Sequence, residues 1–107
     1  MANKREAKKT GGNQSRKIRD EVAALTLAEL VKESKEWLQV VKANPPKGWK
    51  PEVLKDQERL LKELWALAVT VKTEANPRYG RIKERLAGYC ERLRGRHAGK
   101  SPGELRQ

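Results

Sequence analysis

The chain has 107 residues and a formal net charge of +11, so it has room for one domain and its charge favours a polyanionic partner. One cysteine excludes an internal disulfide and a cysteine-rich zinc site, and a single histidine argues against a histidine-based metal site. No apolar run approaches the length of a membrane span, and the basic N-terminus lacks the apolar segment of a signal peptide. We therefore expect an intracellular protein, either cytoplasmic or nuclear or virion-associated.

The positive charge is sorted to the two ends of the chain. Residues 1–19 hold seven basic side chains and one acidic one, and residues 77–107 hold nine and three. Residues 20–76 hold nine basic and ten acidic side chains. A nearly neutral body with two basic ends is typical of proteins that bind nucleic acid or another polyanion.

Residues 1–15, MANKREAKKTGGNQS, contain no apolar period and end in a Gly-rich polar segment, so they are predicted to form a flexible basic arm. Such an arm either solubilises the protein or contacts phosphate groups through counterion release. The candidate phosphate contacts in and next to this arm are Lys4, Arg5, Lys8, Lys9, Arg16 and Lys17.

The first helix is predicted over about 16–42. Its apolar face is formed by Leu27, Leu30, Val31, Trp37, Leu38 and Val41. The mixed charges of residues 32–36, including Glu33, are expected on a solvent-exposed face. Thr26 and Glu29 have the T-x-x-E spacing of a capping box, so a helix break near Thr26 is an open alternative.

Residues 43–50, ANPPKGWK, contain two prolines and a glycine, which end a helix and turn the chain. Their position between two long amphipathic segments predicts an antiparallel helical hairpin. Trp49 either covers the end of this hairpin or stacks on a nucleic-acid base. Lys47 and Lys50 beside it are candidate phosphate contacts.

The second helix is predicted over 51–75, with Pro51 at its first position. Its apolar positions form two adjacent stripes that together cover roughly 160° of the helix surface, more than one neighbouring helix covers. We therefore expect a second copy of the chain to cover part of this face, in a homodimer. The predicted dimer or core residues are Leu60, Leu64, Trp65 and Leu67.

The third helix is predicted over 77–95, with Asn76 as its N-cap and Pro77 at its first position. Its apolar side includes Cys90, which we interpret as a small core residue because no catalytic partner accompanies it. Beside that side, five arginines fall within about 60° of one another along about 27 Å of helix. These candidate phosphate contacts are Arg78, Arg81, Arg85, Arg92 and Arg96.

The expected fold is thus all-α: one three-helix domain over 16–96, an antiparallel hairpin plus a third amphipathic helix, with a flexible tail over 97–107. The sequence has no catalytic motif and no Gly-rich phosphate loop, so we expect neither an enzyme nor a cofactor nor a small-molecule substrate. Membrane association is also disfavoured, because the core of so small a fold requires the apolar side of the third helix.

These features predict a homodimer that binds the phosphate backbone of nucleic acid without strong sequence specificity, with RNA favoured over DNA and duplex over single strand. The predicted architecture is similar to that of nodaviral silencing suppressors, which are dimeric helical hairpins, although no sequence motif is shared. A viral silencing suppressor and a nucleic-acid packaging protein both fit. The alternative is a helical protein-interaction module whose arginines dock on an acidic partner.

Overall fold

The structure, a computed structural model, describes residues 15–71 and 73–105. A helix over residues 15–23 is followed by α2 (Leu27–Ala43), α3 (Pro51–Thr70), α4 (Pro77–Arg96) and the short α5 (Pro102–Leu105). The described ranges contain no strand, which confirms the all-α prediction. Lys4, Arg5, Lys8 and Lys9 of the predicted arm lie outside the described residues.

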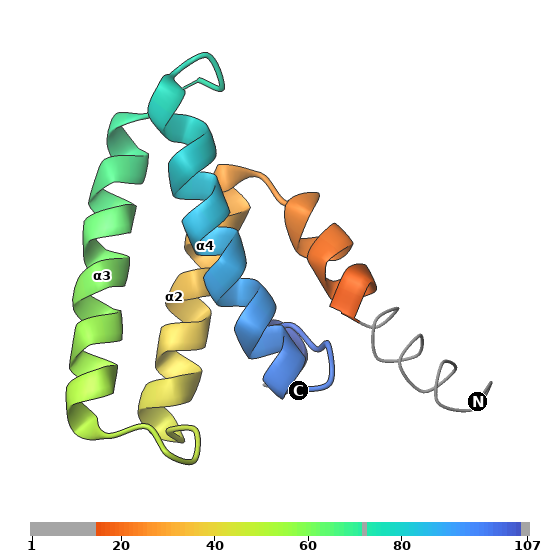
Figure 1. The fold of residues 1–107 in the computed structure, drawn as a ribbon, viewed down its shortest axis with the longest axis vertical. Coiled ribbons are helices and arrows are strands. Elements are labelled where there is room, and N and C mark those ends of the chain that lie inside the picture. The colour runs from red at the N-terminus through yellow and green to blue at the C-terminus, as the bar shows by residue number, and fades with distance from the viewer. Residues whose placement is uncertain (1–14, 72, 106–107) are drawn as a thin grey trace, which may run out of the picture.

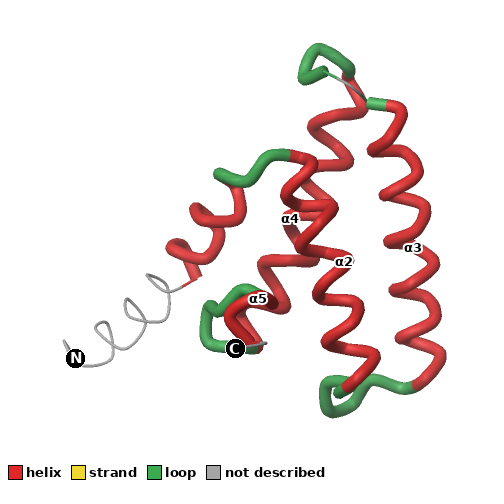
Figure 2. The backbone as a smooth tube through the Cα atoms, turned by 180° about the vertical axis from the view of Figure 1, so that it is seen from behind, coloured by secondary structure: helices red, strands yellow, loops and turns green. Residues whose placement is uncertain are grey.

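The helices α2 and α3 run in opposite directions, and α4 packs against both of them (Figure 1). The view from behind shows α2 and α3 joined by the loop after α2, as the hairpin prediction requires (Figure 2). The helix over 15–23 lies on the other side of α4 from α3 (Figure 1). The outward surface of α4 is therefore bordered by α3 on one side and by this first helix on the other.

The helix break at Thr26 is confirmed, so the segment expected over 16–42 forms two helices. The Thr26 hydroxyl accepts a hydrogen bond from the Glu29 backbone N–H at 3.2 Å, and Glu29 Oε1 accepts one from the Thr26 backbone N–H at 2.9 Å. These bonds complete the capping box and lower the pKa of Glu29, because they favour its charged form.

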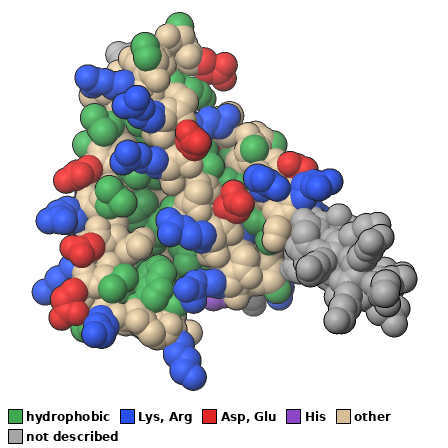
Figure 3. All heavy atoms as spheres, viewed as in Figure 1, with side chains coloured by type: hydrophobic (Ala, Val, Ile, Leu, Met, Phe, Trp, Pro, Cys, Tyr) green, Lys and Arg blue, Asp and Glu red, His purple; other side chains and the backbone are tan. Residues whose placement is uncertain are grey.

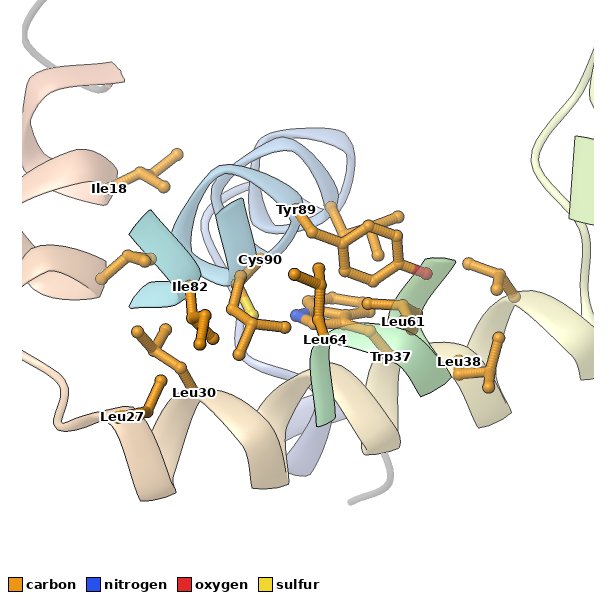
Figure 4. Close-up of a cluster of buried hydrophobic side chains, with 14 of the residues drawn as sticks. Ile18, Leu27, Leu30, Trp37, Leu38, Leu61, Leu64, Ile82, Tyr89 and Cys90 are labelled. Carbon is orange, nitrogen blue, oxygen red and sulfur yellow. The ribbon is translucent and has the colours of Figure 1, made fainter. Parts of the chain in front are cut away.

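The core lies where α2, α3 and α4 meet, and the first helix adds Ile18 and Val22 (Figure 4). Cys90 is fully buried, as predicted, and burial raises the pKa of its thiol, which keeps it protonated and unreactive. Burial likewise raises the pKa of Tyr89 to about 12. Its hydroxyl has no hydrogen-bond partner among the described residues.

The helix α3 ends at Thr70 and not near residue 75 as predicted. Val69, Thr70 and Val71 are consecutive β-branched residues, which lose side-chain freedom in a helix. Val71 adopts an extended conformation and buries its side chain after the helix has ended. The prediction therefore extended the helix too far.

The prediction of a flexible C-terminal tail over 97–107 is wrong for residues 97–105. Gly99 has a positive φ of 83° and donates a hydrogen bond to the Arg94 carbonyl at 2.7 Å, which reverses the chain after α4. The short helix α5 then packs against α2, and Pro102 is buried. The His97 ring stacks on the Trp37 ring, with 5.1 Å between centroids.

Candidate nucleic-acid interface

Five arginines of α4 form one row on its outward surface, which we call the arginine row: Arg78, Arg81, Arg85, Arg92 and Arg96. All five are exposed, and none forms an ion pair with any described residue. Figure 3 shows basic side chains along the face that carries α4, beside a patch of hydrophobic side chains. The structure thus places the predicted stripe on an open surface.

The start of α4 adds to the positive potential of the row. Asn76 caps the helix by accepting a hydrogen bond from the Arg78 backbone N–H at 2.9 Å, and Pro77 occupies the first turn. That turn contains no acidic residue. The positive end of the helix dipole and the guanidinium groups of Arg78 and Arg81 therefore reinforce one another, where helices usually place an acid.

At its other end the row meets the loop between α2 and α3. The guanidinium carbon of Arg96 lies 5.6 Å from the centre of the Trp49 ring, which is a cation–π contact. Trp49 is half-buried and packs against the core, so it covers the end of the hairpin. Because Lys47 and Lys50 flank Trp49 and are exposed, the loop extends the basic surface beyond Arg96.

The sixth arginine of α4 has a different role. Arg94 is buried, and its guanidinium group donates hydrogen bonds to both carboxylate oxygens of Glu33, one of them at 2.9 Å. The same group lies 3.3 Å from Glu21 Oε2, and Trp37 Nε1 donates to Glu33 Oε2 at 3.0 Å. The hydrogen bonds with Glu33 raise the pKa of Arg94, so this buried charge is retained.

The prediction that Glu33 lies on a solvent-exposed face is therefore wrong. Glu33 is 7% exposed, because the Arg94 guanidinium and the Trp37 ring N–H supply the partners that a buried carboxylate requires. A signal was present in the sequence: Glu33 lies about 40° from Trp37 around the helix, at the edge of the apolar face. No comparable signal in the sequence identified Arg94 as its partner.

A groove between α3 and α4 separates the arginine row from the exposed leucines of α3. One hollow in this groove is lined by Leu64, Leu67, Arg78, Arg81, Ile82 and Arg85. The next hollow along the helices includes Leu60, Leu61, Gly88, Tyr89 and Arg92 in its lining. Glu84 and Glu91 also border this second hollow, but neither forms an ion pair with the row.

Two groups of predicted residues are not brought to this surface. Arg16 and Lys17 are exposed on the first helix, which lies across α4 from the groove (Figure 1). Trp65 belongs to the packing of the hairpin, because its ring N–H donates a hydrogen bond to the Ser34 hydroxyl at 2.8 Å and Lys35 lies 5.5 Å over its ring. Leu64 is buried, whereas Leu60 and Leu67 are exposed.

The described residues hold no cluster of side chains that would bind a metal ion, and none of their helices is long and apolar enough to cross a membrane. Comparison with models of protein families, with curated proteins and with solved structures gave no match.

Proposed function

We propose that this protein is a homodimer that binds the phosphate backbone of nucleic acid through the arginine row and the adjoining Lys47 and Lys50. The observation that carries the proposal is the contrast within α4. Its one buried arginine, Arg94, has two carboxylate partners, whereas the five exposed arginines have none among the described residues. Arginines gathered without acids repel one another, and a polyanion removes that repulsion.

The chemistry of the row fits phosphate better than base edges. A guanidinium group presents a planar set of donors that matches two phosphate oxygens. The row follows one face of a rigid helix for about 27 Å, and nothing among the described residues projects from it like a short recognition helix. A face of this kind reads shape and charge, which favours duplex RNA as the ligand. A viral silencing suppressor or a nucleic-acid packaging protein would use such a surface.

A second candidate function is docking of an acidic helical protein in the groove between α3 and α4. The observation that favours it is the exposure of Leu60 and Leu67 directly beside the arginine row. Apolar floors with charged rims bind amphipathic helices.

The first test measures binding of random-sequence duplex RNA, duplex DNA and single strands at several salt concentrations. We expect wild-type affinity to fall steeply with salt, because each phosphate contact releases counterions. The double variant Arg78→Ala with Arg81→Ala should reduce the slope of log affinity against log salt by about 2 for duplex DNA, about 0.9 for each lost phosphate contact.

The matched control is Lys55→Ala with Lys62→Ala, which removes two exposed charges from the outer face of α3. It should leave the salt slope nearly unchanged. If wild-type affinity and slope equal those of a neutral protein of similar size, the nucleic-acid proposal is wrong. If nucleic acid does not bind but an acidic amphipathic peptide does, the second candidate replaces it.

A further inference from the structure

The helix α3 leaves an apolar strip uncovered. Val53, Leu60 and Leu67 recur every seventh residue on one side of α3 and are 37%, 47% and 40% exposed. Of the 20 residues in α3, only Leu61 and Leu64 are buried. An amphipathic helix of this length normally buries a wider stripe, so the packing within one chain leaves much of the apolar face of α3 open to a partner.

Opposite charges border this strip on its two sides. On one side lies the arginine row, which shares the groove hollows with Leu60, Leu64 and Leu67. On the other side, about 40–60° further around α3, lie the exposed carboxylates of Asp56 and Glu63. Asp56 makes only a weak exposed contact within its own helix, 3.6 Å from Arg59. The surface therefore runs from acidic through apolar to basic.

We infer that a second copy of this chain covers the strip, with the two α3 helices side by side in the same direction and the two-fold axis parallel to them. That rotation places the acidic border of each copy over the basic border of the other. A two-fold axis perpendicular to the helices would make the two α3 helices antiparallel. It would bring the acidic borders together and the arginine rows together, which is unfavourable. The arrangement deepens the homodimer proposed above and does not require nucleic acid to bind.

The hollows of the groove show which residues of α3 and α4 lie at the same height along the two helices. Arg85 shares a hollow with Leu64, and Arg92 shares one with Gln57 and Leu60. In the parallel arrangement each residue of α3 lies at the same height along the helix axis as the same residue in the other copy. The partner's Glu63 therefore faces Arg85, and the partner's Asp56 faces Arg92. In the dimer the phosphate-binding part of the arginine row is therefore Arg78, Arg81 and Arg96, together with Lys47 and Lys50.

A second copy fits the strip better than nucleic acid or an unrelated acidic protein. Phosphate groups gain nothing from contact with leucine side chains. A matching apolar strip on a second copy, by contrast, removes the apolar side chains of both strips from water. An acidic partner from another chain would satisfy the arginines but would leave Asp56 and Glu63 beside further carboxylates. The same chain satisfies both borders at once, because it carries the complementary charges itself.

Analytical sedimentation at about 50 μM tests the inferred dimer by measuring whether charge-reversal variants still associate. Variant A carries Asp56→Arg with Glu63→Arg, and variant B carries Arg85→Glu with Arg92→Glu. We expect each alone to weaken the dimer by about 100-fold, because all its border pairs become like-charged. Mixed in equal amounts, A and B should form a heterodimer, because every pair is then again of opposite charge.

Lys55→Glu with Lys62→Glu reverses two charges away from the strip and should leave the dimer intact. Helicity measured by circular dichroism confirms that each variant folds, and restoration on mixing excludes misfolding as the cause of dissociation. A monomeric wild type, or a dimer indifferent to variants A and B, overturns the inference. Nucleic-acid binding by the wild type and by the Arg78→Ala, Arg81→Ala variant, measured separately, reports on the proposed function alone, because neither arginine takes part in the inferred dimer contact.

Discussion

One buried side chain, Arg94 of α4, forms polar contacts with two other helices. Its guanidinium group contacts Glu33 of α2 and Glu21 of the first helix, although these residues are separated by 61 and 73 positions in the chain. Trp37 completes the set by donating its ring N–H to Glu33. These polar contacts fix how α4 sits on α2, and they keep the side of α4 that carries the arginine row turned outward.

We expect Arg94→Met to lower the free energy of unfolding by about 3–5 kcal/mol, because it leaves the Glu33 carboxylate buried without its charged partner. Urea denaturation followed by circular dichroism measures the change. The double variant Arg94→Met with Glu33→Gln should recover part of the loss, since the neutral amide still accepts the Trp37 hydrogen bond. The interpretation fails if Arg94→Met costs no more than Arg92→Met on the exposed row.

At the scale of single helices, the capping box determines where the chain bends between the first helix and α2. Thr26→Ala removes the hydroxyl that accepts from the Glu29 backbone N–H, and we expect a loss of about 1 kcal/mol. Thr26→Ser keeps this hydroxyl, and serine is at least as good an N-cap as threonine, so this variant should not lose that stability. Equal stability of the Ala and Ser variants in a urea titration would contradict this account of the bend.

The long helices were predictable because their apolar period and their caps agree. Pro51, Asn76 and Pro77 mark helix starts by chemistry that needs no tertiary contact. The end of α3 and the short α5 were not predictable in the same way. The end of α3 depends on small propensity differences, and α5 depends on Pro102 finding a buried position against α2.

The candidate site was predictable to the same extent as α4. Arg78 to Arg96 share a face in any straight helix, so their alignment followed from spacing alone. Their relation to other segments did not. The contact between Arg96 and Trp49, which joins the loop to the row, depends on how α4 crosses the hairpin. The burial of Arg94 and Glu33 depends on the same crossing.

At the scale of the whole molecule, folding concentrates positive charge. The unfolded chain spreads its charges, whereas the fold holds five exposed arginines along about 27 Å. We expect that raising NaCl from about 20 to about 200 mM increases Tm by about 2–4 °C, because salt screens this repulsion. The buried contact between Arg94 and Glu33 is screened much less.

Thermal denaturation at the two salt concentrations measures this effect. The Arg78→Ala, Arg81→Ala variant should show a smaller increase of Tm, because part of the repulsion is already absent. An unchanged or lower Tm at high salt would show that charge crowding on α4 does not limit stability.

The contact between Arg94 and Glu33 also bears on how the chain folds during synthesis. The helix α2 packs chiefly against α4, which the ribosome makes only after the hairpin of α2 and α3. Until α4 emerges, Leu30, Trp37 and the Glu33 carboxylate lack the surface that covers them. The hairpin alone therefore leaves its apolar side and a charged group uncovered, and we expect α2 and α3 to reach their native packing only after α4 has left the ribosome.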